Sequence, residues 1–91
     1  MNLYQRPAFV RALKNRPAAE QEQIRERARR VAEVFGHPQT HSGLGVRQFG
    51  RYFEFRVGLQ VRCLFLLEGG GLHLVMVGTH GELSAYLRNN G

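Results

Sequence analysis

The spacing of the apolar residues changes once along the chain, near residue 46, from the period of a helix to that of a strand. Before this point, apolar side chains recur three or four positions apart, at Ile24, Ala28, Val31 and Phe35. This spacing predicts an amphipathic helix, which Pro17 precedes and Gly36 ends. We expect a shorter helix after Pro7, because proline fits a first helical turn, and an extended segment at residues 2–6.

After residue 46, apolar and polar side chains alternate, which is typical of strands. We expect four strands separated by glycine-containing turns, at residues 46–49, 52–57, 60–67 and 72–79. A two-residue turn at Gly58-Leu59 would join the middle pair. One face of this pair is apolar enough to pack against the helices. The opposite face is expected to expose four polar side chains around a partly apolar floor: Tyr52, Glu54, Arg56 and Arg62.

A last helix at residues 82–88 carries Leu83, Tyr86 and Leu87 on one side. The order of elements is then strand, two helices, four strands and a helix (β-α-α-β-β-β-β-α). This order predicts an α+β fold, with the two N-terminal helices packed on one face of a small antiparallel sheet. Ninety-one residues suffice for one core, so we expect a single domain over residues 1–91.

The charge of the chain indicates a polyanionic partner. Thirteen basic residues stand against seven acidic ones, a formal net charge of +6, and Lys14 is the only lysine. Such a field attracts nucleic acid or an acidic protein. No apolar run is long enough to span a membrane and the N-terminus shows no leader pattern, so we expect no membrane contact and a cytoplasmic location.

The residues that usually hold metals show no ligand spacing. Cys63 is the only cysteine, and in an alternating strand we expect it to be a small core residue. The histidines form no helical pair; they are His37, His41, His73 and His80. We therefore expect neither a metal site nor a cofactor.

Two arginines and one histidine are the candidates for chemistry. Across a tight hairpin Arg56 and Arg62 can lie close together, and two guanidinium groups at that distance favour an anion between them. Alternatively, Glu54 pairs with one arginine and water solvates the other. His80 follows the last strand, between Gly78-Thr79 and Gly81. It could move a proton near neutral pH, or it could only cap or precede the final helix.

From about residue 43 to residue 87, the chain resembles the RelE/ParE superfamily of toxins from toxin–antitoxin systems, and the order of the N-terminal helices is similar as well. The likeness rests on three segments: Arg56-Val57-Gly58, Val61-Arg62-Cys63-Leu64-Phe65 and Val77-Gly78-Thr79-His80-Gly81-Glu82-Leu83. The Gly-Thr-His ending is more similar to the YafQ and HigB branches than to the gyrase-poisoning ParE branch. The resemblance implies a RelE-like fold, a cognate antitoxin partner, and metal-independent, ribosome-dependent cleavage of mRNA by an endoribonuclease (mRNA interferase).

The resemblance also assigns roles to residues. Arg62 matches an arginine of a family strand, His80 matches a histidine after the last strand of some nuclease members, and Arg56 matches a basic residue of the preceding strand. His80 would then shuttle the proton of the RNA 2′-hydroxyl, while Arg56 and Arg62 stabilise the transition state. Five further residues are expected to bind RNA or to assist: Glu54, Glu82, Arg47, Arg51 and Tyr86.

The chain departs from the family pattern in two respects. It lacks the lysine pair that RelE uses, and no aromatic residue directly follows His80. Two other functions therefore stay open. The protein could be a ParE-like, non-nuclease inhibitor of DNA gyrase, or it could be a non-catalytic module in which Arg56 and Arg62 hold an anion or RNA.

Overall fold

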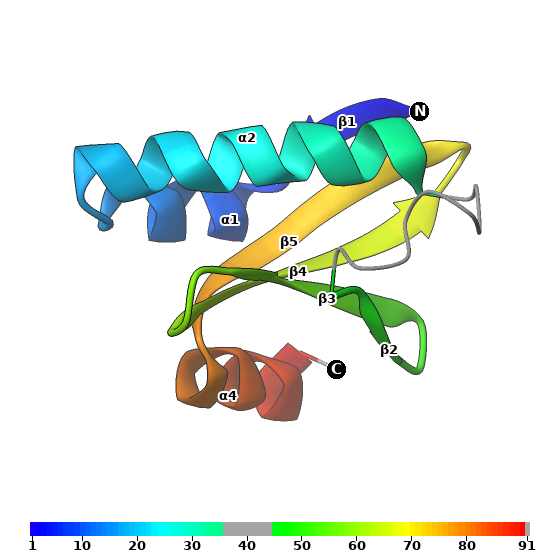
Figure 1. Cartoon of the computed structure of the whole chain (residues 1–91). Coiled ribbons are helices and arrows are strands. Elements are labelled where there is room, and N and C mark those ends of the chain that lie inside the picture. The colour runs from blue at the N-terminus through cyan, green and yellow to red at the C-terminus, as the bar shows by residue number, and fades with distance from the viewer. Residues whose placement is uncertain (36–44, 91) are drawn as a thin grey trace.

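The helices and strands follow the expected order along the chain, and the sheet separates two helical layers (Figure 1). The computed structural model describes residues 1–35 and 45–90. Its elements are β1 (Asn2–Gln5), α1 (Pro7–Lys14), α2 (Ala18–Val34), β2 (Arg47–Phe49), β3 (Tyr52–Val57), β4 (Val61–Glu68), β5 (Gly71–Thr79) and α4 (His80–Asn90). The expected helix end at Gly36 and the histidines His37 and His41 lie outside the described residues. No helix in the described part of the chain is long and apolar enough to cross a membrane.

The five strands form one mixed sheet in the order β1-β5-β4-β3-β2. Neighbouring strands from β2 to β5 are antiparallel, as expected. In contrast, β1 runs parallel to β5, from the Asn2 and Gly71 pair to the Gln5 and Leu74 pair. The alternation of side chains does not distinguish parallel from antiparallel pairing. The α+β class is confirmed, but the sheet is mixed rather than antiparallel throughout.

The turn between β3 and β4 sets the register of the two candidate arginines. It contains three residues, 58–60, rather than the expected two, and Gly58 adopts a φ of 73°. A two-residue turn would place Arg62 opposite Phe55, whose side chain lies in the core beneath the helix pair. With the longer turn, Arg62 pairs directly with Arg56. The apolar side chains of the main core then share one face of the two strands, and the two arginines share the other.

Strand β5 contains one irregularity that changes the face its side chains occupy. Its register with β4 shifts, so that Leu64 pairs with Met76 but Phe65 pairs with Leu74. The extra residue, Val75, forms a β-bulge, and both Val75 and Met76 pack on the side of α4. Because of the bulge, the apolar side chains that come before and after it along β5 are all buried or partly buried.

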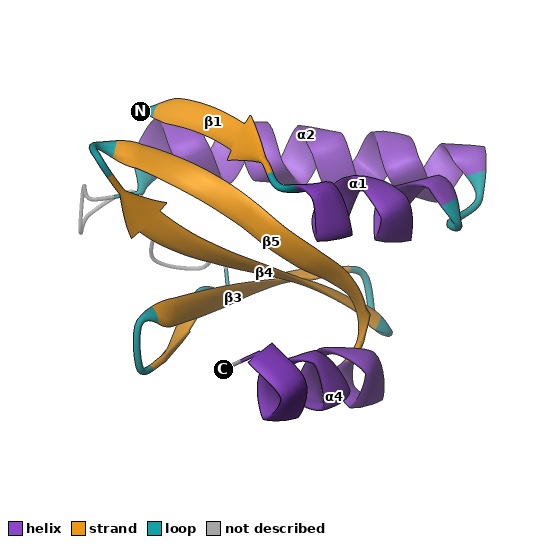
Figure 2. Ribbon diagram, turned by 180° about the vertical axis from the view of Figure 1, so that it is seen from behind, coloured by secondary structure: helices purple, strands orange, loops and turns teal. Residues whose placement is uncertain are grey.

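The main core lies between the sheet and the helices α1 and α2 (Figure 2). Each helix buries the face that its apolar spacing predicts, with Phe9 of α1 and Ile24 of α2 fully buried. Phe35, just after α2, packs edge-on against Phe65, with ring centroids 5.4 Å apart. Cys63 is a free thiol in this core, as expected, and burial raises its pKa.

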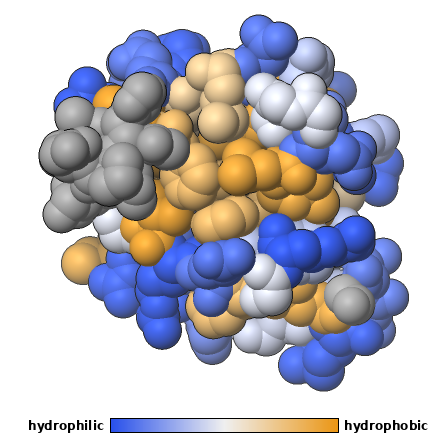
Figure 3. All heavy atoms as spheres, turned by 90° about the vertical axis from the view of Figure 1, so that its right-hand side faces the viewer, coloured by the Kyte–Doolittle hydropathy of each residue, from blue (hydrophilic) through white to orange (hydrophobic). Residues whose placement is uncertain are grey.

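The opposite face of the sheet is not open, because α4 folds back onto it (Figures 1 and 2). Leu83 of α4 is buried in a second apolar cluster that includes Tyr52 and Leu64. The expectation that Tyr52 and Glu54 are exposed is therefore wrong, since each is only 6% exposed. Seen from the side, apolar side chains form a band between polar regions above and below it (Figure 3). The central strands are thus buried on both faces.

Helix α4 begins at His80, two residues earlier than expected, because Thr79 and Glu82 cap its first turn. The backbone N–H of Thr79 donates to Glu82 Oε1 at 2.8 Å, and the Glu82 N–H donates to Thr79 Oγ1 at 3.2 Å. This reciprocal pair is a capping box. Gly78 makes room for it, since a Cβ there would lie 2.8 Å from Glu82 Oε1. His80 is therefore the first residue of a helix rather than the end of a strand.

The cap also determines the charge of Glu82. The Thr79 N–H has the largest effect in lowering the pKa of this carboxyl below its ordinary value, and the Thr79 hydroxyl and the Arg16 guanidinium act in the same direction. Nη1 of Arg16 lies 3.7 Å from Glu82 Oε1. A carboxylate whose pKa is lower in the folded state stabilises the fold above the pKa of the unfolded chain. This contribution is lost as the pH falls through the folded-state pKa.

Replacing Glu82 with Gln should destabilise the protein at neutral pH by about 0.3–1 kcal/mol, the usual contribution of a negative charge at a helix N-terminus. Urea unfolding followed by circular dichroism measures this difference. As the pH falls below the ordinary carboxyl pKa of 4.5 and then through the lower folded-state pKa of Glu82, the carboxylate becomes protonated and the difference in stability between the two proteins should disappear. Glu33→Gln is the control, since it removes a charge from an exposed position on α2. A gap that persists in acid would contradict the capping role.

Candidate functional site

Arg62, His80 and Glu54 meet where α4 begins, and we call these three residues the contact group. Arg62 lies on β4, and its Nη1 is 3.0 Å from Nδ1 of His80. The same Nη1 lies 3.6 Å from Oε1 of Glu54 on β3. Glu54 pairs in register with Leu64, so it is a diagonal neighbour of Arg62 across the two strands. Three residues that the sequence put forward are therefore brought together.

The contact between Arg62 and His80 can be a hydrogen bond with only one tautomer of the imidazole. An arginine guanidinium only donates hydrogen bonds, and it keeps its proton in proteins. For this contact to be a hydrogen bond, Nδ1 of His80 must accept, which requires the neutral ring with its proton on Nε2. Protonation of Nδ1 would remove the acceptor and set two cations against each other. His80 is exposed, so solvent and ligands can reach it.

Glu54 is the most buried member of the contact group. Its side chain is only 7% exposed, and that of Arg62 is 18% exposed. A carboxylate at this depth needs a cationic partner, because an unpaired buried charge is costly. The sequence left open whether Glu54 pairs with an arginine, and it pairs with Arg62. This arginine therefore has two internal partners before any ligand arrives.

Arg56 faces Arg62 directly across the β3–β4 pair, as expected. Its side chain is exposed, and no carboxylate of the described residues lies at ion-pair distance from it. Its carbonyl accepts a hydrogen bond from Nε of Arg27 on α2, at 3.3 Å. The strand pair thus presents one arginine held by a carboxylate beside one whose charge is available to an anion.

Arg47 borders the contact group. It lies on the edge strand β2 and pairs in register with Glu54. Its guanidinium sits over the ring of Phe49, 5.6 Å from the centroid, which is within the range of a cation–π contact. Arg47 is therefore placed to contact a ligand that extends from Arg62 toward β2.

Arg51 lies outside the contact group. It donates to the Tyr52 hydroxyl at 3.1 Å, and this hydrogen bond raises the pKa of Arg51 above its ordinary value. Tyr52 pairs with Leu66, which is four residues from Arg62 on β4, a distance of roughly 13 Å. The structure therefore does not bring Arg51 together with the other candidate residues.

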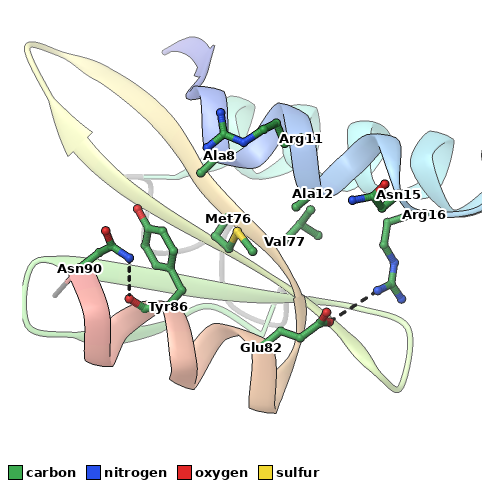
Figure 4. A pocket seen from close by; sticks show the side chains of 10 residues that line it. All are labelled: Ala8, Arg11, Ala12, Asn15, Arg16, Met76, Val77, Glu82, Tyr86 and Asn90. Atoms are coloured by element: carbon green, nitrogen blue, oxygen red, sulfur yellow. Dashed lines mark hydrogen bonds and ion pairs between the residues drawn. The ribbon is translucent and has the colours of Figure 1, made fainter.

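Glu82 and Tyr86 line a groove between α1, β5 and α4 (Figure 4). The groove has a volume of about 620 Å³. Glu82 extends toward Arg16 in this view, and its Oε1 is bound to the Thr79 N–H. Its place is thus in the cap of α4, although it is close in sequence to His80. Tyr86 lies farther along α4, where its side chain packs partly against the second core.

Thr79 and Arg16 contribute to this region and were not predicted from the sequence. Thr79 and Glu82 have the Thr-x-x-Glu spacing of a capping box, so a signal for the cap was present. Arg16, which also pairs with Glu20, links the α1–α2 connection to Glu82. No local pattern indicates this contact, because it joins segments that are far apart in the sequence.

The chemistry available to the contact group is proton transfer by an imidazole and charge stabilisation by guanidinium groups. Within residues 1–35 and 45–90, no three His, Cys, Asp or Glu side chains gather as a metal site would require.

The fold has counterparts among solved structures, whereas no family profile and no characterised protein matches the sequence. A chain of the RelB-RelE antitoxin–toxin complex from Methanococcus jannaschii superposes with a TM-score of 0.66 at 17% identity, over 91% of this chain and 96% of that one. A YoeB/ParE toxin from Agrobacterium tumefaciens gives a TM-score of 0.66 at 18% identity, over 88% and 99%. The isolated E. coli RelE toxin gives 0.66 at 12% identity, over 97% of each chain. The chain therefore has the fold of the RelE-type toxins.

Proposed function

We propose that the protein is the toxin of a type II toxin–antitoxin system and acts as a metal-independent endoribonuclease on mRNA at the ribosome. The observation that carries this proposal is the contact group of Arg62, His80 and Glu54 on a RelE-like fold. Several similar structures are themselves toxin–antitoxin complexes. The formal net charge of +6 suits an RNA substrate as well as an acidic antitoxin, and both partners would be met in the cytoplasm.

RNA cleavage without a metal uses the 2′-hydroxyl of the RNA as the nucleophile. The reaction needs a base for the hydroxyl proton, an acid for the leaving 5′-oxygen, and cations for the charge that develops on the phosphate. A guanidinium cannot be the base because it does not release its proton. We assign both proton transfers to His80, which takes the proton of the 2′-hydroxyl and returns it, from the imidazolium, to the leaving 5′-oxygen. Arg56 and Arg62 stabilise the charge. DNA lacks the 2′-hydroxyl and would not be cut.

Substrate binding would free the base. Without a ligand, Arg62 occupies the acceptor nitrogen of His80. A bound phosphate offers Arg62 two oxygens that match its planar fork. When Arg62 turns to the phosphate, Nδ1 of His80 can take the 2′-hydroxyl proton. The imidazole is then neutral before the reaction and becomes cationic beside a phosphate that gains negative charge.

The remaining residues would position the reacting groups or the flanking nucleotides. The buried carboxylate of Glu54 keeps the Arg62 guanidinium beside His80, so Glu54 is a positioning residue. Arg56 lies opposite Arg62 and would bind the same phosphate or its neighbour. Arg47 borders this region on β2, and Tyr86 lies farther along α4. We assign both to contacts with RNA on either side of the cleaved linkage. We assign Glu82 to the helix cap.

Replacing His80 with Ala should lower the rate of RNA cleavage by about two to four orders of magnitude, the usual effect of losing a general acid or base. Single-turnover cleavage of mRNA on ribosomes measures this rate. His73→Ala is the matched control: His73 stacks on Tyr4, with ring centroids 4.8 Å apart, and takes no part in the contact group. The control should cleave at the wild-type rate. Full activity in His80→Ala would remove the imidazole from the mechanism.

Expression in a bacterium tests the class of function. The wild-type protein should arrest growth, whereas Arg62→Ala and His80→Ala should each relieve the arrest. Primer extension should show mRNA cuts at regular positions within codons, and only with the wild-type protein. Growth arrest with a DNA-damage response and intact mRNA would instead identify a gyrase inhibitor. RNA binding with neither effect would identify a non-catalytic module.

A further inference from the structure

A second groove, distinct from the one beside Tyr86, lies between α2 and the β3–β4 turn. Six residues line its volume of about 520 Å³: Gln23, Glu26, Arg27, Arg30, Val57 and Gly58. This volume is within the range of about 300–1,000 Å³ that is usual for ligand sites. Val57 is the only lining residue with an apolar side chain, and the one acid, Glu26, is paired with Arg29. The groove therefore suits a charged ligand.

The arginines of α2 fall into two groups according to their partners. Arg25 and Arg29 both lie near Glu22, at 3.6 and 3.8 Å. Arg27 and Arg30 line the groove, and within the described residues no carboxylate lies at ion-pair distance from either. They are three positions apart and hence on the same side of the helix. Two uncompensated guanidinium groups at one groove would attract an anion.

A backbone contact connects this groove to the strand pair that carries the contact group. Nε of Arg27 donates to the Arg56 carbonyl at 3.3 Å. Arg56 pairs across the strands with Arg62, and Arg62 in turn contacts His80. The groove lies on the α2 face of the sheet, whereas the side chains of Arg56 and Arg62 lie on the α4 face, so a ligand that reaches both places would pass around the β3–β4 turn. Phosphates that repeat along a flexible chain match arginines at several separate places better than a single anion does.

We propose that this groove binds a backbone phosphate of single-stranded RNA, outside the linkage that His80 would cleave. The inference rests on the proposed function, because one RNA strand would occupy both places. An acidic peptide would meet the same arginines, but an amphipathic segment also needs pockets for apolar anchors, and Val57, the one apolar side chain of the lining, is buried in the main core. The groove thus contributes to the affinity for RNA and leaves the chemistry to the contact group.

The double variant Arg27→Gln/Arg30→Gln tests the proposal. The matched control, Arg25→Gln/Arg29→Gln, removes the same charge from the same helix, but from arginines that have glutamate partners. The probe is a short single-stranded RNA whose 2′-hydroxyls are all methylated, so that it binds without being cut. The groove variant should bind about tenfold more weakly than the control. Its salt dependence (log K against log salt) should become shallower by about 0.7 for each phosphate that the variant no longer neutralises.

A dinucleotide distinguishes the two places, because it is too short to reach from the contact group to the groove. Its binding should be the same in the groove variant and in the control. Equal weakening of RNA binding in both double variants would overturn the proposal in favour of a general charge effect. Unchanged RNA binding with weakened binding of polyglutamate would overturn it in favour of an acidic protein. If the wild-type protein binds the RNA but cuts no mRNA, the proposed nuclease fails while the groove stands.

Discussion

The burial of β4 on both faces is the constraint on which the rest of the architecture depends. Between Val61 and Leu66, most of its side chains are buried, and they alternate between the two cores. A strand that is apolar on both sides must be covered on both sides, so α1 and α2 pack on one face and α4 on the other. Arg62 is the exception to this pattern. It lies where the second core ends and α4 begins, which is why a polar site can form there.

The helices could be predicted from the sequence because each buries one face, and the positions from Ile24 to Val31 show the period directly. The parallel pairing of β1 with β5 could not, since the same alternation fits either direction. The sequence does contain a signal for the position of α4. Leu64 and Leu66 lie on the face opposite Val61, and two apolar residues there indicate that something covers them.

The candidate site was predictable only in part. The pairing of Arg56 with Arg62 follows once the apolar residues of both strands share a face, although the turn proved one residue longer than expected. The partnership of Glu54 and Arg62 depends on burial by α4, which lies elsewhere in the sequence. The contact between Arg62 and His80 depends on where α4 starts, and the Thr-x-x-Glu spacing marks that position. Arg27 meets the Arg56 carbonyl across 29 residues of chain, and no local pattern indicates it.

An arginine that already holds a carboxylate and an imidazole discriminates among anions. Any incoming group must compete with Glu54 and His80 for the same guanidinium, so a lone inorganic phosphate gains little from the exchange. A polymer that makes several contacts at once can bear the cost of breaking them. If the protein acts on RNA as proposed, this unliganded arrangement of Arg62 would itself favour long nucleic acid over small anions.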